Sequence, residues 1–223
     1  MQHSPEAGNA GEEIAPPMER DLLGALGERS IVLVGMMGAG KTSVGKRLAH
    51  RLGLPFVDAD HAIEEAANKS IPEIFAEHGE AYFRAGERKV IARLLREGRS
   101  VIATGGGAFM SEETRAAIAE AGVSIWLKAE VPVLFERVRR RPTRPLLQTA
   151  DPQGTLRRLV EERYPVYALA DVTVISREVP HEAMVDDVVA ALAAHLAVAP
   201  EISAAPAAAP GAAGNEEDMK DDG

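Results

Sequence analysis

The chain of 223 residues contains no cysteine, and this absence excludes several kinds of chemistry. Without cysteine there is no disulfide, no cysteine-ligated zinc and no thiolate nucleophile. No uninterrupted apolar run reaches the ~18 residues of a membrane-spanning helix. The N-terminus also lacks the basic and apolar regions of a signal peptide. We therefore expect a cytoplasmic protein with no segment inserted in a membrane.

The two ends of the chain have few large apolar residues and hold most of its negative charge. Residues 1–18 carry a net charge of −3 and residues 196–223 a net −5, so only −1 of the total −9 belongs to the segment between them. Ends of this composition bury too little apolar surface to offset the entropy lost on folding. We predict disordered tails at residues 1–18 and 197–223 around one domain at 19–196. A short amphipathic stretch, residues 18–26, is expected to cap this domain.

Short apolar runs alternate with helical patterns through the central segment. The runs lie at residues 31–34, 54–57, 101–103, 123–127 and 172–175. Strands that alternate with helices form right-handed βαβ units and a parallel sheet. The third run, and the fifth with Thr173 as its one polar residue, are too continuous for half-exposed strands, so we expect helices to cover both faces of those strands. Ligands bind beyond the carboxyl ends of such strands, and the loops there should hold the functional site.

The first apolar run leads into a phosphate-binding sequence. Residues 35–42 read Gly-Met-Met-Gly-Ala-Gly-Lys-Thr and precede a helical pattern. In such a loop the backbone N–H groups surround a polyphosphate, and the helix dipole favours its negative charge. Lys41 can reach the β- and γ-phosphates, and the hydroxyl of Thr42 can complete the coordination shell of Mg2+. The pattern predicts that the chain binds a nucleoside triphosphate.

Two carboxylates, Asp58 and Asp60, follow the second apolar run. In an extended segment, side chains two residues apart point to the same side. Beside a Mg2+-nucleotide, one carboxylate can order the water shell of the metal while the other accepts the proton of an attacking hydroxyl. A simpler alternative is that Asp60 only caps a helix that begins at His61. The position at the ligand-binding edge of the sheet favours the catalytic interpretation.

Three consecutive glycines, Gly105, Gly106 and Gly107, follow the third apolar run. Glycines without side chains let a small polar substrate lie against the backbone and accept hydrogen bonds from its N–H groups. The alternative is a flexible turn. The phosphate loop at the same edge of the sheet favours the first interpretation.

Eight arginines and no lysine occur between residues 137 and 163, and prolines exclude a single regular helix in the first part of this stretch. Such a loop suits a lid that places a guanidinium group against the transferred phosphoryl group. Nucleic-acid binding is the rival interpretation, but acidic residues are interleaved with the arginines and aromatic residues are sparse. We expect Arg157 and Arg158 to be solvent-exposed on a helix.

Six motifs, taken in order, resemble those of the shikimate kinase family. Besides the phosphate loop they are Phe56-Val57-Asp58-Ala59-Asp60, Phe83-Arg84-Ala85-Gly86-Glu87, Thr104-Gly105-Gly106-Gly107, Thr143-Arg144-Pro145-Leu146-Leu147 and Glu162-Arg163-Tyr164-Pro165-Val166-Tyr167. The resemblance covers residues 28–195. It implies an α/β, three-layer P-loop kinase fold with a five-stranded parallel sheet in the order 2-3-1-4-5, a lid near residues 139–154 and a substrate-binding subdomain. It also implies the reaction of ATP with shikimate to give ADP and 3-phosphoshikimate.

The resemblance also implies roles for individual residues. ATP would be bound by Gly38, Ala39, Gly40, Lys41, Thr42, Ser43 and Arg144, and Mg2+ by Thr42 and Asp58. Shikimate would be bound by Asp60, Arg84, Gly105, Gly106, Gly107 and Arg163, with the two arginines on its carboxylate. Lys41, Asp58, Asp60 and Arg144 would be the catalytic residues, and the adenine would lie near Arg140 and Pro180.

Two rival functions follow from the same motifs. A gluconate kinase-like enzyme would share the phosphate loop, but the Asp-x-Asp pair, Arg84, the glycine triplet and the Arg-Pro-Leu-Leu sequence taken together disfavour it. A non-catalytic, nucleotide-dependent regulatory module is disfavoured because every catalytic position carries a competent side chain. We expect a monomer acting on a small molecule, since the sequence contains no long exposed apolar helix.

Overall fold

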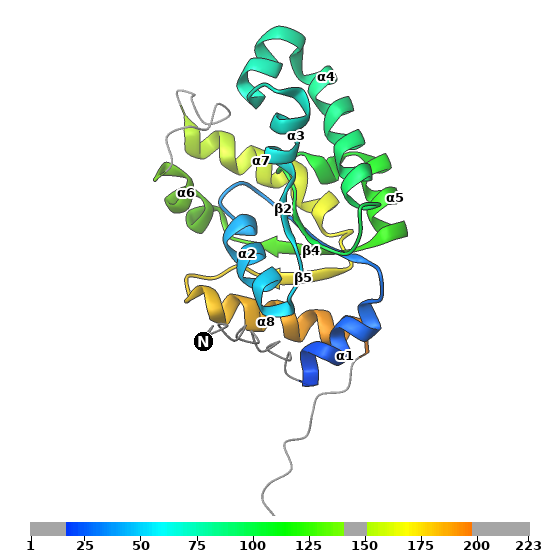
Figure 1. Cartoon of the computed structure of the whole chain (residues 1–223). Helices are drawn as coiled ribbons and strands as arrows, with labels where there is room; N and C mark the ends of the chain where they lie inside the picture. The colour runs from blue at the N-terminus through cyan, green and yellow to red at the C-terminus, as the bar shows by residue number, and fades with distance from the viewer. Residues whose placement is uncertain (1–16, 141–150, 198–223) are drawn as a thin grey trace, which may run out of the picture.

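Five strands form a parallel sheet with helices on both of its faces (Figure 1). The structure is a computed structural model, and it describes residues 17–140 and 151–197. The strands are β1 Ser30–Val34, β2 Phe56–Asp58, β3 Val101–Ala103, β4 Gly122–Lys128 and β5 Val172–Ile175. Their order is β2-β3-β1-β4-β5, which confirms the predicted order 2-3-1-4-5.

Helices connect and cover the strands. They are α1 Pro17–Leu26, α2 Lys41–Leu52, α3 Ala59–Ala67, α4 Ile71–Leu94, the 3-10 helix η1 Ala108–Met110, α5 Glu112–Ala121, α6 Val131–Arg139, α7 Pro152–Tyr167 and α8 His181–His195. In Figure 1, α1 and α8 lie below the strands, whereas α4, α5 and α7 lie above them. None of the helices in the described part of the chain is long and apolar enough to cross a membrane.

The register of the strands brings their carboxyl ends to one level. Ala103 pairs with both Leu33 and Asp58, and Val34 pairs with Trp126. The segments that follow β1, β2 and β3 therefore begin at the same edge of the sheet. These are the segments in which the sequence predicts the phosphate loop, the two carboxylates and the glycine triplet.

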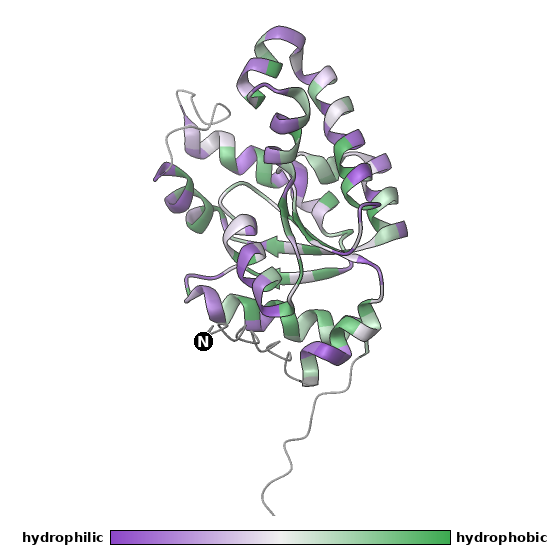
Figure 2. Ribbon diagram, in the orientation of Figure 1, coloured by the Kyte–Doolittle hydropathy of each residue, from purple (hydrophilic) through white to green (hydrophobic). Residues whose placement is uncertain are grey.

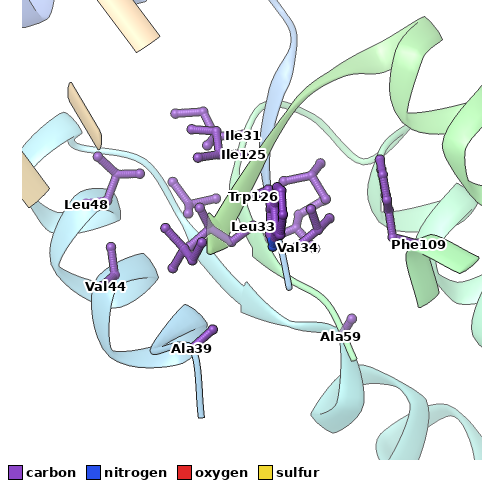
Figure 3. Close-up of a cluster of buried hydrophobic side chains, with 14 of the residues drawn as sticks. Ile31, Leu33, Val34, Ala39, Val44, Leu48, Ala59, Phe109, Ile125 and Trp126 are labelled. Atoms are coloured by element: carbon purple, nitrogen blue, oxygen red, sulfur yellow. The ribbon is translucent and has the colours of Figure 1, made fainter. Parts of the chain in front are cut away.

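The core lies on both faces of the sheet, because its central strands are buried throughout. Every residue of β1 and β3 is buried, and Figure 2 shows hydrophobic residues concentrated in the strands. In Figure 3, Val44 and Leu48 of α2 lie on one side of the strands and Phe109 of η1 lies on the other. This two-sided burial is expected for a parallel sheet covered by helices.

The prediction that helices cover both faces of β5 is wrong. Val172 and Val174 are buried, but Thr173 and Ile175 alternate with them and are exposed. β5 is an edge strand, and it packs on α8 with one face only. Thr173 was the available signal of an exposed face, but Ile175 hid the alternation, because an edge strand can carry an apolar residue on its exposed face.

The start of α4 agrees with the sequence, whereas α1 covers the predicted amphipathic stretch but begins at Pro17, inside the segment 1–18 that was expected to be a tail. The rest of that expected tail and residues 198–223 lie outside the described residues. α1 starts at Pro17, and its Leu22 and Leu26 are fully buried, as expected of an amphipathic cap. At the start of α4 the Glu73 carboxylate accepts a hydrogen bond from Ser70 N at 2.8 Å. This capping interaction satisfies a backbone donor that the helix itself leaves unpaired. The α3 helix and the first part of α4 project away from the sheet, at the top of Figure 1.

Candidate active site

The phosphate loop is formed by a backbone that only glycine adopts readily. Gly38 and Gly40 have φ angles of 82° and 98°. A Cβ on Gly38 would lie 2.8 Å from Val138 Cγ2, so α6 also leaves no space for a side chain there. Lys41 Nζ donates to the carbonyl oxygens of Gly35 at 2.7 Å and Met36 at 3.0 Å, which holds the ammonium group over the loop.

A cavity of about 690 Å³ opens above this loop. All six loop residues predicted to bind the nucleotide line it, namely Gly38, Ala39, Gly40, Lys41, Thr42 and Ser43. Asp58, Asp60, Gly105 and Gly106 also line it, so the ends of three strands contribute to one cavity. Arg140 and Pro180, the residues expected near adenine, lie on its wall as well. A cavity of this size accommodates a small-molecule ligand.

Asp58 and Asp60 both line this cavity, but they belong to the start of a helix and not to the extended segment that the sequence predicted. Asp58 is the last residue of β2 and the N-cap of α3, and its Oδ1 accepts a hydrogen bond from Asp60 N at 3.2 Å. Asp60 is therefore in the first turn of a helix, and neither an extended Asp-x-Asp segment nor a cap by Asp60 is present. His61 is exposed in the same turn.

The hydroxyl of Thr42 donates to Asp58 Oδ2 at 3.0 Å. A hydroxyl and a carboxylate side by side at a phosphate loop fit Mg2+, which prefers oxygen ligands and keeps much of its water shell. In residues 17–140 and 151–197 no group of three His, Cys, Asp or Glu side chains could hold a metal ion. The two residues therefore suit a metal that is held mainly by phosphate and water.

Arg84 lies on α4 against the glycine triplet. Its Nη1 donates to Glu87 Oε2 at 2.7 Å, and a Cβ on Gly107 would lie 2.5 Å from the same nitrogen. Gly107 is thus needed for the guanidinium group to lie flat against the backbone. A Cβ on Gly105 would lie 2.7 Å from Asp60 Oδ1 and 2.9 Å from Glu87 Oε1. Because Gly105 and Gly107 have no side chains, an arginine and two carboxylates can lie close to the backbone of the triplet.

Glu87 is 2% exposed, and its Oε1 has no hydrogen-bond partner in the described structure. Burial raises the pKa of this carboxyl, the Arg84 guanidinium opposes the rise, and the charge of Asp60 adds to it. The sequence interpretation assigned no role to Glu87. Its position three residues after Arg84 on a helix was the available signal, because such residues are neighbours on one helix face.

Arg163 of α7 also reaches the glycine triplet. Its Nη1 donates to the Gly106 carbonyl at 3.2 Å, and the side chain is buried. Arg84, Gly107 and Arg163 line a second cavity of about 300 Å³, whereas Asp60, Gly105 and Gly106 line the first. The three predicted side chains thus lie around the glycine triplet, and the six predicted shikimate-binding residues line these two cavities.

Comparison with known proteins shows the family of this chain. The family model for shikimate kinase matches residues 37–193. The chain belongs to the shikimate kinase family. It is 60% identical over 184 residues to shikimate kinase from Rhodopseudomonas palustris, covering 82% of this chain and 91% of that protein. It is 64% identical over 178 residues to the enzyme from Bradyrhizobium diazoefficiens, covering 80% and 86%.

A solved shikimate kinase has the same fold. The structure of shikimate kinase from Acinetobacter baumannii in complex with shikimate matches with a TM-score of 0.70 and 36% identity, covering 75% of this chain and 94% of that one. Membership of the shikimate kinase family makes this chain an ATP-dependent kinase, and the P-loop kinase fold is confirmed.

Two predicted features of this shikimate kinase lie outside the described residues. Arg144 is one, and most of the lid segment at 139–154 is the other. Of the described arginines, Arg157 and Arg158 are exposed, as predicted.

The structure adds Arg137, which the sequence interpretation left without a role. Its Nη1 donates to Ser176 Oγ at 2.8 Å and to the Gly38 carbonyl at 3.2 Å, and its Nη2 donates to the Arg177 carbonyl at 2.7 Å. This side chain connects α6 with the phosphate loop and with the segment after β5. No local pattern distinguished it from the neighbouring arginines.

Proposed function

We propose that this chain transfers the γ-phosphoryl group of ATP to the 3-hydroxyl of shikimate, giving ADP and 3-phosphoshikimate on the route to chorismate and the aromatic amino acids. The observation that carries the proposal is that Asp60, Arg84 and Arg163 meet at the glycine triplet, beside the cavity that Lys41 and the phosphate loop line. A cationic pair beside a carboxylate and a phosphate loop suits an acceptor that bears both a carboxylate and hydroxyl groups.

In this mechanism Asp60 accepts the proton of the shikimate 3-hydroxyl as its oxygen attacks the γ-phosphorus. The bond between the γ-phosphorus and the bridging oxygen breaks, and ADP leaves. Lys41 stabilises the negative charge on the phosphoryl group, because phosphoryl transfer depends mainly on positioning and charge stabilisation. We assign the same task to Arg144.

Mg2+, when bound, neutralises charge on the β- and γ-phosphates. Thr42 and Asp58 would hold it, and their hydrogen bond at 3.0 Å supports this assignment because it brings a hydroxyl and a carboxylate together beside the phosphate loop. The phosphates are bound by the backbone of residues 38–43.

We assign the carboxylate of shikimate to Arg84 and Arg163. Guanidinium groups bind carboxylates through paired N–H donors in a fixed geometry. The approach of Arg84 to Gly107 and of Arg163 to Gly106 supports this role, because both guanidinium groups lie at the triplet that also adjoins Asp60. We further propose that the enzyme acts as a cytoplasmic monomer, with neither nucleic acid nor membrane as a partner.

The first test is the choice of acceptor. In a coupled assay of ADP release with Mg-ATP, shikimate is expected to give turnover and gluconate is not. A Lys41→Met variant purified in the same way is the control, because it removes the phosphate-binding ammonium group and should abolish any activity that belongs to the chain. Turnover with gluconate and none with shikimate would contradict the proposal and favour the sugar-acid kinase.

A further inference from the structure

Tyr167 is a fully buried residue to which the mechanism above gives no task. It is the last residue of α7 and lies four residues after Arg163, so the two side chains share one face of the helix. Its hydroxyl donates to the carbonyl oxygen of Gly106. Arg163 Nη1 donates to the same oxygen at 3.2 Å. A carbonyl oxygen has two lone pairs and can accept both hydrogen bonds.

The ring of Tyr167 is held between other aromatic side chains. Its centroid lies 6.0 Å from that of Trp126 and 6.5 Å from that of Phe109. Trp126 lies beside Val34, the residue before the phosphate loop (Figure 3). The Tyr167 hydroxyl is also 3.9 Å from Met36 Sδ, which belongs to that loop. One rigid side chain therefore contacts both the phosphate loop and the glycine triplet.

Gly106 is the member of the triplet that the fold requires least. A Cβ on it would meet its nearest neighbours at 3.6–3.7 Å, which is ordinary contact, and its φ angle is outside the left-handed range. A Cβ on Gly105 or Gly107 would instead displace a functional side chain. The absence of a side chain at Gly106, which lines the first cavity, therefore indicates that a ligand approaches its backbone.

Three successive glycines have more conformational freedom than any other sequence of this length. Because the peptide unit is planar, holding the Gly106 carbonyl toward α7 directs the N–H of Gly107 to the opposite side. In the described structure neither Gly106 N–H nor Gly107 N–H donates to a protein acceptor. Orientation of the Gly106–Gly107 peptide therefore decides whether the Gly107 N–H is available to a ligand.

We propose that Tyr167 is a positioning residue for the acceptor: its hydroxyl fixes the Gly106 peptide and, through the shared carbonyl, holds Arg163 in place to bind the substrate carboxylate. This inference rests on the proposed function, because it concerns the same shikimate site. Burial raises the pKa of Tyr167 to about 12, so the hydroxyl remains a hydrogen-bond donor at neutral pH.

The chain offers a matched control for a test of this role. Tyr164 lies one turn earlier on α7, and its hydroxyl also donates to a backbone carbonyl, that of Ala129. Ala129 follows β4 and is outside the glycine triplet. Tyr167→Phe and Tyr164→Phe each remove a tyrosine hydroxyl and the hydrogen bond that it donates to one backbone carbonyl. Only Tyr167→Phe changes a carbonyl of the acceptor site. Both variants keep the ring that packs in the core and should fold.

The experiment measures steady-state kinetics and thermal unfolding of the full chain and of both variants. For Tyr167→Phe we expect the KM for shikimate to rise about tenfold, while kcat and the KM for ATP change less than about threefold. For Tyr164→Phe we expect all three parameters to change less than about threefold. The melting temperatures of the two variants should fall by similar amounts, of about a few degrees.

The outcomes distinguish a failure of the role proposed for Tyr167 from a failure of the proposed function. A wild-type enzyme that turns over shikimate, combined with equal effects of the two variants on its KM, would show that Tyr167 is only a core residue. A fall in kcat without a change in KM would also overturn the proposal. A wild-type enzyme with no shikimate turnover would refute the function and the proposal together.

Discussion

Asp60 and Glu87 are two carboxylates that lie against one glycine, yet their surroundings suit them to different tasks. Asp60 lines the large cavity, where it can reach a substrate hydroxyl. Glu87 is buried behind it and pairs with Arg84. Because the folded state raises the pKa of Glu87 above its unfolded value, its contribution to stability is fully present below the unfolded pKa and is lost as the pH rises through the folded pKa.

Amide replacements should separate these two tasks. Asp60→Asn is expected to lower kcat by at least about 100-fold, because it removes the proton acceptor. Glu87→Gln should instead mainly raise the KM for shikimate, because the neutral amide holds Arg84 less firmly. It should also weaken the decline in stability with rising pH. Steady-state kinetics and unfolding at several pH values measure these effects.

The control for this comparison is nucleotide binding. Trp126 is the single tryptophan of the chain and lies close to Gly35, with Cδ1 3.2 Å from the position of a Cβ on that residue. Its fluorescence should therefore report nucleotide binding, which both variants are expected to retain. An Asp60→Asn enzyme with nearly normal kcat would exclude the proton-accepting role.

Among the helices, α1 covers the end of the sheet that is remote from the candidate site. Its last carbonyls accept hydrogen bonds from Arg29 and Arg99, which precede β1 and β3. Its buried Glu19 accepts a hydrogen bond from Arg51 Nε of α2 at 2.9 Å, and Arg51 also pairs with Asp186 of α8. The helix therefore joins the segments before β1 and β3 to α2 and, through Arg51, to α8.

Truncation of a buried α1 side chain should affect stability and spare catalysis. Leu22→Ala is expected to lower the free energy of unfolding by about 2–5 kcal/mol, because it leaves a cavity where the side chain is fully buried. Leu23→Ala is the matched control with a partly buried leucine, and its effect should be smaller. Denaturant titration measures the stabilities. A large change in kcat per folded molecule for Leu22→Ala would contradict the assignment of α1 to stability alone.

For the molecule as a whole, the last described helix, α8, packs its buried side chains into the core before the acidic C-terminal segment begins. The buried side chains of the last helix, α8, lie between Met184 and Ala193, and this helix ends at His195. Leu196 follows α8 and still packs against the core. We therefore propose that residues 198–223 take no part in catalysis.

Deletion of residues 198–223 is expected to leave the melting temperature and the kinetic constants nearly unchanged. The shortened protein loses a net charge of −5, so it should be retained less strongly on an anion-exchange column. Both forms should sediment as monomers. A marked loss of activity or stability in the shortened protein would show that the segment contributes to the domain.

Features formed by residues close together in the sequence could be predicted from the sequence. The phosphate loop is one continuous segment between a strand and a helix, and the alternation of strands with helices predicted a parallel sheet. The sheet order was predicted with the help of the family resemblance and is confirmed, and the roles of the site residues, which the same resemblance implies, stay predictions. The local geometry of Asp60 was not, because the sequence Asp-Ala-Asp suits both an extended segment and the start of a helix.

Contacts between distant segments were decided only by the tertiary structure. The Gly106 carbonyl meets Arg163 and Tyr167, which are 57 and 61 residues away, and no local pattern specifies that meeting. The exposed face of β5 likewise depends on its place at the edge of the sheet. Periodicity and short motifs report what each segment can form. Which side chains finally share a carbonyl depends on packing around a common core, and that packing involves the whole domain at once.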